Sequence, residues 1–240
     1  MARASASSRA AAPRRLPRGR HALAPDDVLR DQRERLIAAV PGVVAVRGYA
    51  AMSVADIVRA AAVSRNAFYK SFADKRECFA VAHDAGHERL FEILTVPCET
   101  GATIEERVEG SLIAGLAALA GEPSLARMLF VEAPAAGEEI ALRHHEWLGR
   151  YATLLRAAGA DLPNESKPGA EVELLIAGGI ASRIGSEVLH GRATGLPGLI
   201  APMRDYVLAF YATAEAASGT RSAQRSQGRA APRSQRRTAA

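Results

Sequence analysis

The sequence has little cysteine and no long apolar run. Cys78 and Cys98 are the two cysteines among 240 residues, and they are too few and too far apart for a redox motif or a cysteine metal site. Two free thiols fit the reducing cytoplasm. The longest uncharged apolar run, Gly110 to Gly121, has twelve residues, which is too short to span a bilayer. We therefore expect a cytoplasmic protein that does not cross a membrane.

Motifs of the common enzyme classes are also missing. The sequence contains no GXSXG, no Walker loop and no GXGXXG that opens a βαβ unit, and these motifs mark hydrolases, nucleotide-binding proteins and dehydrogenases. We therefore expect no enzymatic activity and no cofactor. A pocket with strongly perturbed titratable groups would reopen that question.

Basic charge is concentrated at the two ends of the sequence. Residues 1–25 and residues 218–240 each carry six arginines and no acidic residue, and residues 26–217 carry 19 basic against 26 acidic residues. An acidic body repels a nucleic-acid duplex, so any contact with DNA must be local. Both tails should be disordered when free. An arm that reaches the minor groove or phosphate is one hypothesis for the first tail, and a solubilising tail is the alternative. The candidate residues of the arm are Arg14, Arg15, Arg18 and Arg20.

Between the tails the apolar residues follow a helical period, and no segment shows the two-residue period of a β-strand. Proline and glycine separate the helical runs. The expected helices span residues 26–47, 75–94, 104–120, 124–133, 138–158, 170–192 and 199–217, with two short ones within 53–72. We predict an all-α protein with a DNA-binding domain at 26–95 and a helical domain at 96–217. Residues 96–102 are the expected linker, and Pro41 should kink the first helix.

The stretch from 53 to 72 predicts two short helices that cross. An apolar stripe at i, i+3, i+4 and i+7 is formed by Val54, Ile57, Val58 and Ala61. Ser53 precedes this stripe and Asp56 follows three residues later, a pattern that caps a helix start. Ser64 begins the second helix. Two short helices separated by about three residues form a helix-turn-helix.

The second helix carries side chains that suit DNA. Arg65 can pair with guanine and Asn66 with adenine, while Tyr69 and Lys70 can reach phosphate. A solvated polar face is the alternative for these four residues alone. The next segment favours DNA binding, because residues 74–77 resemble another capping box that opens a helix with Lys75 in its first turn.

Residues 48–79 are similar to the TetR family of transcriptional regulators. The matching features are Gly48-Tyr49 closing a helix, Met52 or Ser53 where a threonine commonly stands, the Ile57 helix, Val63-Ser64, Phe68-Tyr69, Phe72 and Lys75. The resemblance implies a DNA-binding set of Ser53, Val54, Ser64, Arg65, Asn66, Ala67, Tyr69, Lys70 and Lys75. The chain departs from the family at Ala62, where glycine is usual, and at Ser71, where histidine is frequent.

The resemblance also implies a homodimer, in which the last two helices pair with their two-fold copies. Both of these helices have broad apolar faces that need cover. Two recognition helices on one face of DNA would bind an inverted-repeat operator.

A small-molecule pocket is expected within residues 128–156. The candidate ligand-binding residues are Phe130, His144, Trp147 and Tyr151. Ordinary helical core is the alternative for them. His83 and His87, at i and i+4, could bind a metal, but no third ligand is obvious and HEXXH is absent. A solvated face is the favoured interpretation, and no metal is expected.

The function that these features favour is a nucleoid-associated, sequence-specific repressor that leaves its operator when it binds a small apolar effector. Activation instead of repression stays open. An architectural or interaction protein with the same motif and no ligand is the alternative.

Overall fold

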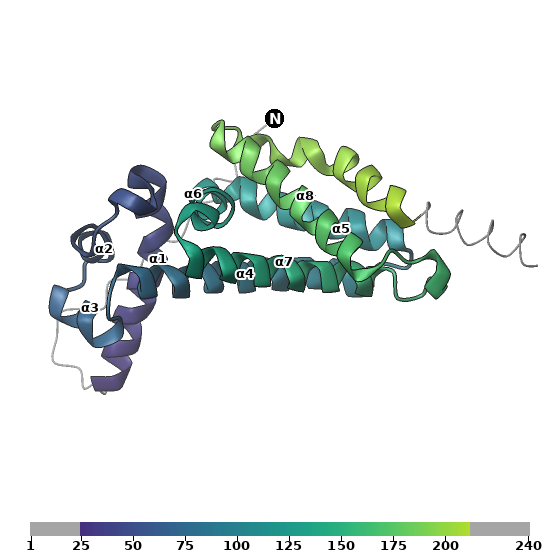
Figure 1. Cartoon of the computed structure of the whole chain (residues 1–240). Helices are drawn as coiled ribbons and strands as arrows, with labels where there is room; N and C mark the ends of the chain where they lie inside the picture. Colours follow the sequence, from purple (N-terminus) through teal and green to yellow (C-terminus); the bar gives the residue numbers. More distant parts are fainter. Residues whose placement is uncertain (1–24, 212–240) are drawn as a thin grey trace, which may run out of the picture.

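The computed structural model describes residues 25–211, and every regular element in this range is helical (Figure 1). The expected all-α fold is therefore confirmed. The two arginine-rich tails, including Arg14, Arg15, Arg18 and Arg20, lie outside the described residues, as do the last residues of the helix that we expected to reach 217.

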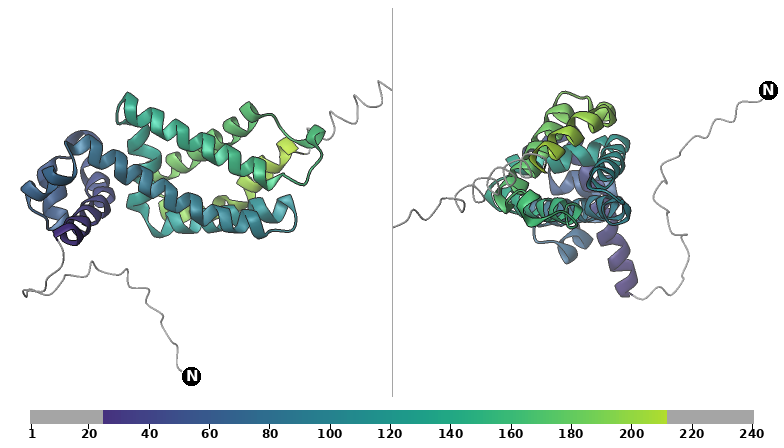
Figure 2. Two further views of the ribbon diagram at one scale, coloured as in Figure 1. Left: turned by 90° about the horizontal axis from the view of Figure 1, so that it is seen from below. Right: turned by 90° about the vertical axis from the view of Figure 1, so that its right-hand side faces the viewer.

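Three helices form a small domain at one end of the molecule (Figure 2). They are α1 (Pro25–Ala51), α2 (Val54–Ala61) and α3 (Arg65–Ser71). Their inward faces share a core that includes Leu36, Val40, Ile57 and Phe68, each fully buried. This burial is the main source of stability for helices as short as α2 and α3.

The kink predicted at Pro41 stays a prediction; the residue at which α1 leaves helical backbone angles is Gly48, with φ 71° and ψ 160°. Proline prefers a helical φ and removes one amide hydrogen bond. Glycine adopts a positive φ without a steric penalty. The sequence therefore marks the break with Gly48, as the resemblance implied.

The long helix α4 (Lys75–Thr100) runs from the small domain into the body of the molecule. The linker predicted at 96–102 is wrong, because α4 continues through Pro97 to Thr100. Ser111 Oγ donates to the carbonyl of Leu94 (2.9 Å), and the buried Cys98 has its Sγ 3.6 Å from the carbonyl of Leu154. Tertiary contacts thus hold this last part of α4 in place.

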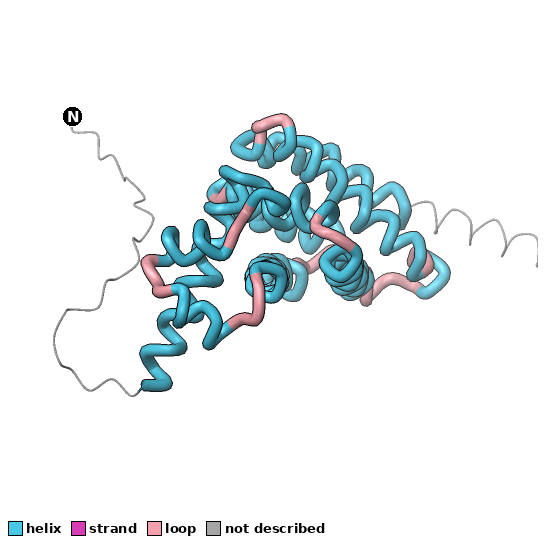
Figure 3. Tube along the Cα trace, turned by 60° about the vertical axis from the view of Figure 1, so that its left-hand side comes forward, coloured by secondary structure: helices cyan, strands magenta, loops and turns pink. Residues whose placement is uncertain are grey.

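The remaining helices pack together as the body of the molecule, which Figure 3 draws as a tube along the Cα trace. They are α5 (Ile104–Gly121), α6 (Pro123–Arg127), α7 (Glu138–Ala158) and α8 (Ala170–Leu189), followed by the 3-10 helix η4 (Ala193–Leu199) and helical residues 200–211. The helix expected at 124–133 is divided into α6, a π-helical turn η1 (Met128–Glu132) and a 3-10 turn η2 (Ala133–Ala135). A further 3-10 turn, η3 (Asn164–Ser166), precedes α8.

Among the described residues, no helix taken singly has the length and apolar character to cross a membrane. One pair, Ile104–Gly121 with Pro123–Ala135, meets both criteria jointly but is bent by 103°.

Candidate functional site

The N-terminus of α2 is capped as the sequence predicts. Ser53 Oγ accepts from the amide of Asp56 (3.3 Å), and the amide of Ser53 donates to Asp56 Oδ2 (3.1 Å). This reciprocal capping box satisfies two amides that a helix end leaves unpaired. Val54 is half-buried, so its side chain also belongs to the domain core.

The turn between α2 and α3 places Ala62 in the left-handed region, with φ 51° and ψ 44°. It is the only non-glycine residue of the described chain with a positive φ. Its carbonyl accepts from Arg35 Nη2 (3.1 Å), and the amide of Val63 donates to the carbonyl of Val58 (3.0 Å). The turn keeps a helix-terminating conformation without the glycine that is usual in the family.

Helix α3 has a buried inner face and an exposed outer face. Ser64 Oγ accepts from the amide of Ala67 (3.1 Å), which confirms the predicted helix start. Ala67 and Phe68 are buried on the inner face, so the side chain of Ala67 contacts protein core. The outer face exposes Arg65, Asn66, Tyr69 and Lys70. These four side chains are free to meet a DNA groove, with Arg65 Nη2 3.4 Å from Tyr69 Oη.

Lys75 is placed differently from the exposed side chains of α3. Its Nζ donates to three backbone carbonyls at the end of α1 and just beyond it, those of Tyr49 (3.2 Å), Ala50 (3.1 Å) and Met52 (2.9 Å). A lysine ammonium has three donors, and here all three are used within the protein. Lys75 therefore ties the start of α4 to the end of α1, where the negative end of the helix dipole lies.

A second contact ties the small domain to the body at the break in α1. The amide of Tyr49 donates to Glu132 Oε2 (2.9 Å), and Arg127 pairs with Glu132 Oε1 (2.8 Å). Glu132 closes the π-helical turn η1. This interdomain role of Glu132 was not predicted, because the contact joins residues 83 positions apart.

The body contains an apolar cavity of about 120 Å³ between α4, α5, α7 and α8. Arg107 is the one charged residue of its lining. The polar groups of the lining already have partners: Arg107 donates to the carbonyls of Gly101 and Ala158, Ser111 to that of Leu94, and Tyr151 Oη lies 2.8 Å from His87 Nδ1. Burial raises the pKa of Tyr151, so its hydroxyl stays protonated.

The four predicted ligand residues divide between the cavity and its surroundings. Phe130 and Tyr151 line the cavity, whereas His144 and Trp147 lie beside it. All four surround His87, with ring centroids between 5.2 and 5.8 Å away. Their role in binding a ligand stays a prediction.

The solvated face predicted for His83 and His87 is wrong. Both side chains are fully buried, and His144 from α7 lies beside them. The period of α4 places both histidines on the face that α7 covers, and sequence spacing alone could not bring His144 to them. Burial lowers the pKa of His87 well below its ordinary value and that of His144 to about 4, so both rings are neutral at neutral pH.

Comparison with known proteins agrees with this arrangement. A family model described as bacterial regulatory proteins of the tetR family matches residues 41–82. No curated protein matches the chain.

Three solved structures with the same fold share 18–20% identity with the chain. FadR from Bacillus subtilis, solved with stearoyl-CoA, has a TM-score of 0.64 at 18% identity and covers 72% of this chain and 96% of its own. The fatty acid degradation regulator FadR from Bacillus halodurans has a TM-score of 0.66 at 20% identity, with 74% and 94% covered. A TetR-like regulator from Rhodococcus sp. RHA1 has a TM-score of 0.58 at 18% identity, with 74% and 96% covered.

The matched segment contains the capped α2, the turn at Ala62 and the exposed face of α3, and it ends within the helix that leads into the body. Residues 41–82 therefore match the DNA-binding segment of TetR-family regulators, and the described helices share the fold of solved TetR-family structures.

Proposed function

We propose that the protein is a dimeric repressor that leaves an inverted-repeat operator when a long apolar effector enters the cavity between α4, α5, α7 and α8. The proposal that an apolar effector binds rests on the cavity itself. Its lining offers apolar side chains, and its polar groups already have partners within the protein. A polar ligand would have to break those hydrogen bonds, whereas an apolar chain would leave them intact.

The size of the cavity supports a mechanism in which the effector changes the structure. At about 120 Å³, the cavity is smaller than the roughly 300–1,000 Å³ that is usual for ligand sites. An acyl chain must therefore separate the surrounding helices in order to enter. Because only three residues separate the end of α3 from the start of α4, displacement of α4 would move the recognition helix. Effector and operator would then favour different states of one dimer.

The relation to fatty-acid regulators supports an acyl chain as the effector. The Bacillus subtilis FadR structure contains stearoyl-CoA, and its fold is that of this chain. Arg107 is the one charged residue of the cavity lining, and its guanidinium is already bound to the carbonyls of Gly101 and Ala158 and to Asp161.

The operator part is tested by selecting bound duplexes from a random DNA pool with the full-length protein. We expect an inverted repeat. Arg65→Ala and Asn66→Ala should each cost about 1–3 kcal/mol of operator binding and relax the base preference at one position of each half-site. If no sequence is enriched and binding is weak and strongly salt-dependent, the architectural alternative is favoured.

The effector part is tested with stearoyl-CoA, free stearate and coenzyme A, measured by operator release and thermal shift. We expect release and a raised melting temperature with at least one of the acylated compounds and with neither coenzyme A nor buffer, because ligands that bind the native state stabilise it. Ala181→Phe, which fills the cavity, should abolish the response while operator binding remains. The matched control is Ala157→Phe, at an exposed position of α7. An unchanged response in Ala181→Phe would overturn the cavity as the effector site.

A further inference from the structure

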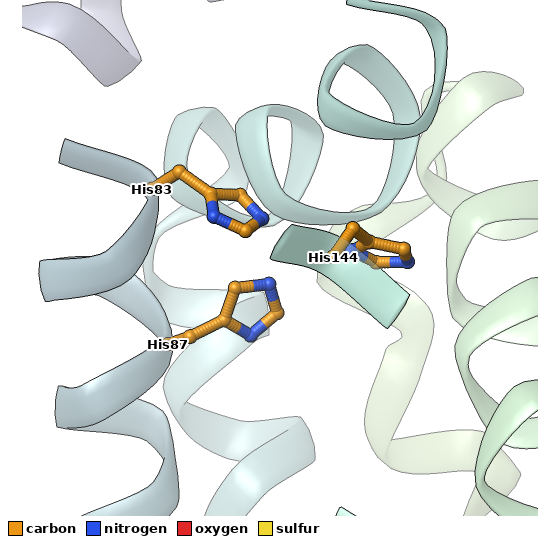
Figure 4. A group of neighbouring side chains, drawn as sticks. All are labelled: His83, His87 and His144. Carbon is orange, nitrogen blue, oxygen red and sulfur yellow. The ribbon is translucent and has the colours of Figure 1, made fainter. Parts of the chain in front are cut away.

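Three imidazole rings converge between α4 and α7 (Figure 4). His83 and His87 lie one turn apart on α4, and His144 projects toward them from α7. One ring nitrogen from each residue can be chosen so that all three lie within 4.8 Å of one another. The ring centroids of His83 and His87 are 4.5 Å apart.

Each ring has a buried nitrogen without a hydrogen-bond partner. These atoms are Nε2 of His83, Nε2 of His87 and Nδ1 of His144. A buried polar atom that lacks a partner costs roughly 1–3 kcal/mol. Native proteins seldom tolerate such atoms unless a water, an ion or a function accounts for them. Three such atoms in one cluster therefore indicate a shared partner.

The other nitrogens of the two α4 histidines are held by neighbouring side chains. His83 Nδ1 is 3.3 Å from Asp84 Oδ1, and His87 Nδ1 is 2.8 Å from Tyr151 Oη. Asp84 is fixed in turn by Trp147 Nε1 (3.1 Å) and Arg143 Nη1 (2.8 Å). A carboxylate that accepts from one ring nitrogen leaves the opposite nitrogen as a lone-pair donor, and metal-binding histidines are typically oriented in this way.

We propose that His83, His87 and His144 form a binding site for a first-row transition-metal ion, with Zn²⁺ as the ion that fits best. Three imidazole nitrogens suit zinc, whereas Ca²⁺ and Mg²⁺ require oxygen ligands. Tetrahedral zinc with nitrogen at about 2.0–2.1 Å brings its ligand atoms to roughly 3.3 Å from one another. The three nitrogens, which now lie within 4.8 Å of one another, must therefore approach by up to roughly 1.5 Å when the ion binds. The fourth position is left for water or an exogenous ligand.

The site would join the helix that leads to the DNA-binding domain with the helix that covers the cavity. Phe79, one turn before His83 on α4, contacts Tyr49 at the end of α1, with ring centroids 4.7 Å apart. Phe130 and Tyr151 touch His87 on one side and line the cavity on the other. The metal site does not depend on the identity of the apolar effector.

The test uses the full-length protein after treatment with a chelator. Zn²⁺ binding is measured by equilibrium dialysis with elemental analysis, and Co²⁺ is added as a spectroscopic probe. We expect one ion per chain and the intense visible absorption of four-coordinate Co²⁺. The melting temperature should rise with Zn²⁺. Absence of stoichiometric binding by the folded wild-type protein would overturn the proposal.

Variants distinguish this site from binding by surface histidines. His144→Gln, at a half-buried position, should weaken Zn²⁺ binding at least ~10-fold and remove the four-coordinate Co²⁺ spectrum. His145→Gln changes the exposed neighbour and should bind as the wild type does. Asp84→Asn, which neutralises the orienting partner of His83 and also removes the ion pair with Arg143, should weaken binding by about 10–100-fold. Equal affinity of the wild type and His144→Gln, or of the wild type and Asp84→Asn, would contradict the assignment.

Discussion

At the scale of single residues, the strained backbone at Ala62 is a direct target for mutation. A left-handed conformation costs a non-glycine residue about 1–2 kcal/mol. Replacement by glycine removes this cost, but part of the gain in stability is lost because glycine has more conformational freedom in the unfolded chain. With φ 51° at this position, we expect Ala62→Gly to raise the free energy of unfolding by about 0.5–1 kcal/mol. Chemical denaturation measures the change. Ala60→Gly, exposed within α2, should instead lower it by about 1 kcal/mol, and a similar loss in both variants would refute this account of the turn.

The two lysines of the DNA-binding domain should have separate effects. Lys70 is exposed on α3, whereas Lys75 donates to three carbonyls at the end of α1. We expect Lys75→Met to lower the free energy of unfolding by about 1.5–3 kcal/mol, as for hydrogen bonds to charged groups. Lys70→Met should leave stability nearly unchanged and weaken binding to all DNA sequences. Denaturation and the salt dependence of DNA binding distinguish the two. The phosphate role predicted for Lys75 would be supported instead if its loss reduced only the salt slope.

At the scale of elements, the C-terminal end of α8 depends on one carboxylate. Arg192 Nε donates to Glu187 Oε2 (2.6 Å), and Arg183 from the same helix bonds Oε1. Hydrogen bonds from Arg192 and then Arg183 lower the pKa of Glu187 to about 2. A lowered folded-state pKa stabilises the fold above the unfolded value near 4.3, and this stabilisation is lost as the pH falls from there toward 2.

Glu187→Gln should therefore remove part of the loss of stability between pH 4.3 and pH 2. Denaturation at a series of pH values, with the exposed Glu171→Gln as the control, measures the difference. If the slope of stability against pH in this window were the same for wild type and Glu187→Gln, the two arginines would not be the cause of the shift.

At the scale of the whole molecule, exposed apolar side chains mark the proposed dimer face. Leu175 and Leu189 of α8 are 70% and 60% exposed, and Tyr206 of the following helix is 40% exposed. We expect Leu175→Glu to shift the protein toward monomer in sedimentation experiments, because a charge on this face would lose its hydration on pairing. Leu142→Glu, at a 58% exposed position of α7, is the control. A dimer that both variants leave intact would place the interface elsewhere.

The local sequence predicted the features that depend on neighbours along the chain. The capping box of Ser53 and Asp56, the start of α3 at Ser64 and the limits of α7 at 138 and 158 all follow from hydrogen bonds or apolar periods within a few residues. The departure at Ala62 was visible in the same way, by comparison with the glycine that is usual in the family, whereas its positive φ comes from the structure. Several of these features carry the resemblance to the TetR family.

Tertiary packing decided the features that join distant parts of the chain. The local sequence predicts a helix break at Pro97, but contacts with α5 and α7 keep α4 helical through it. In the sequence, His83 and His87 are typical of a polar helix face. In the structure, α7 covers them and places His144 beside them. Glu132 reaches the amide that Gly48 frees at the end of α1. The sequence by itself determined where most helices begin, how they are capped and the resemblance to the TetR family. The tertiary structure alone decided the cavity, the histidine cluster and the link between the domains, because each is formed by side chains that only long-range packing brings together.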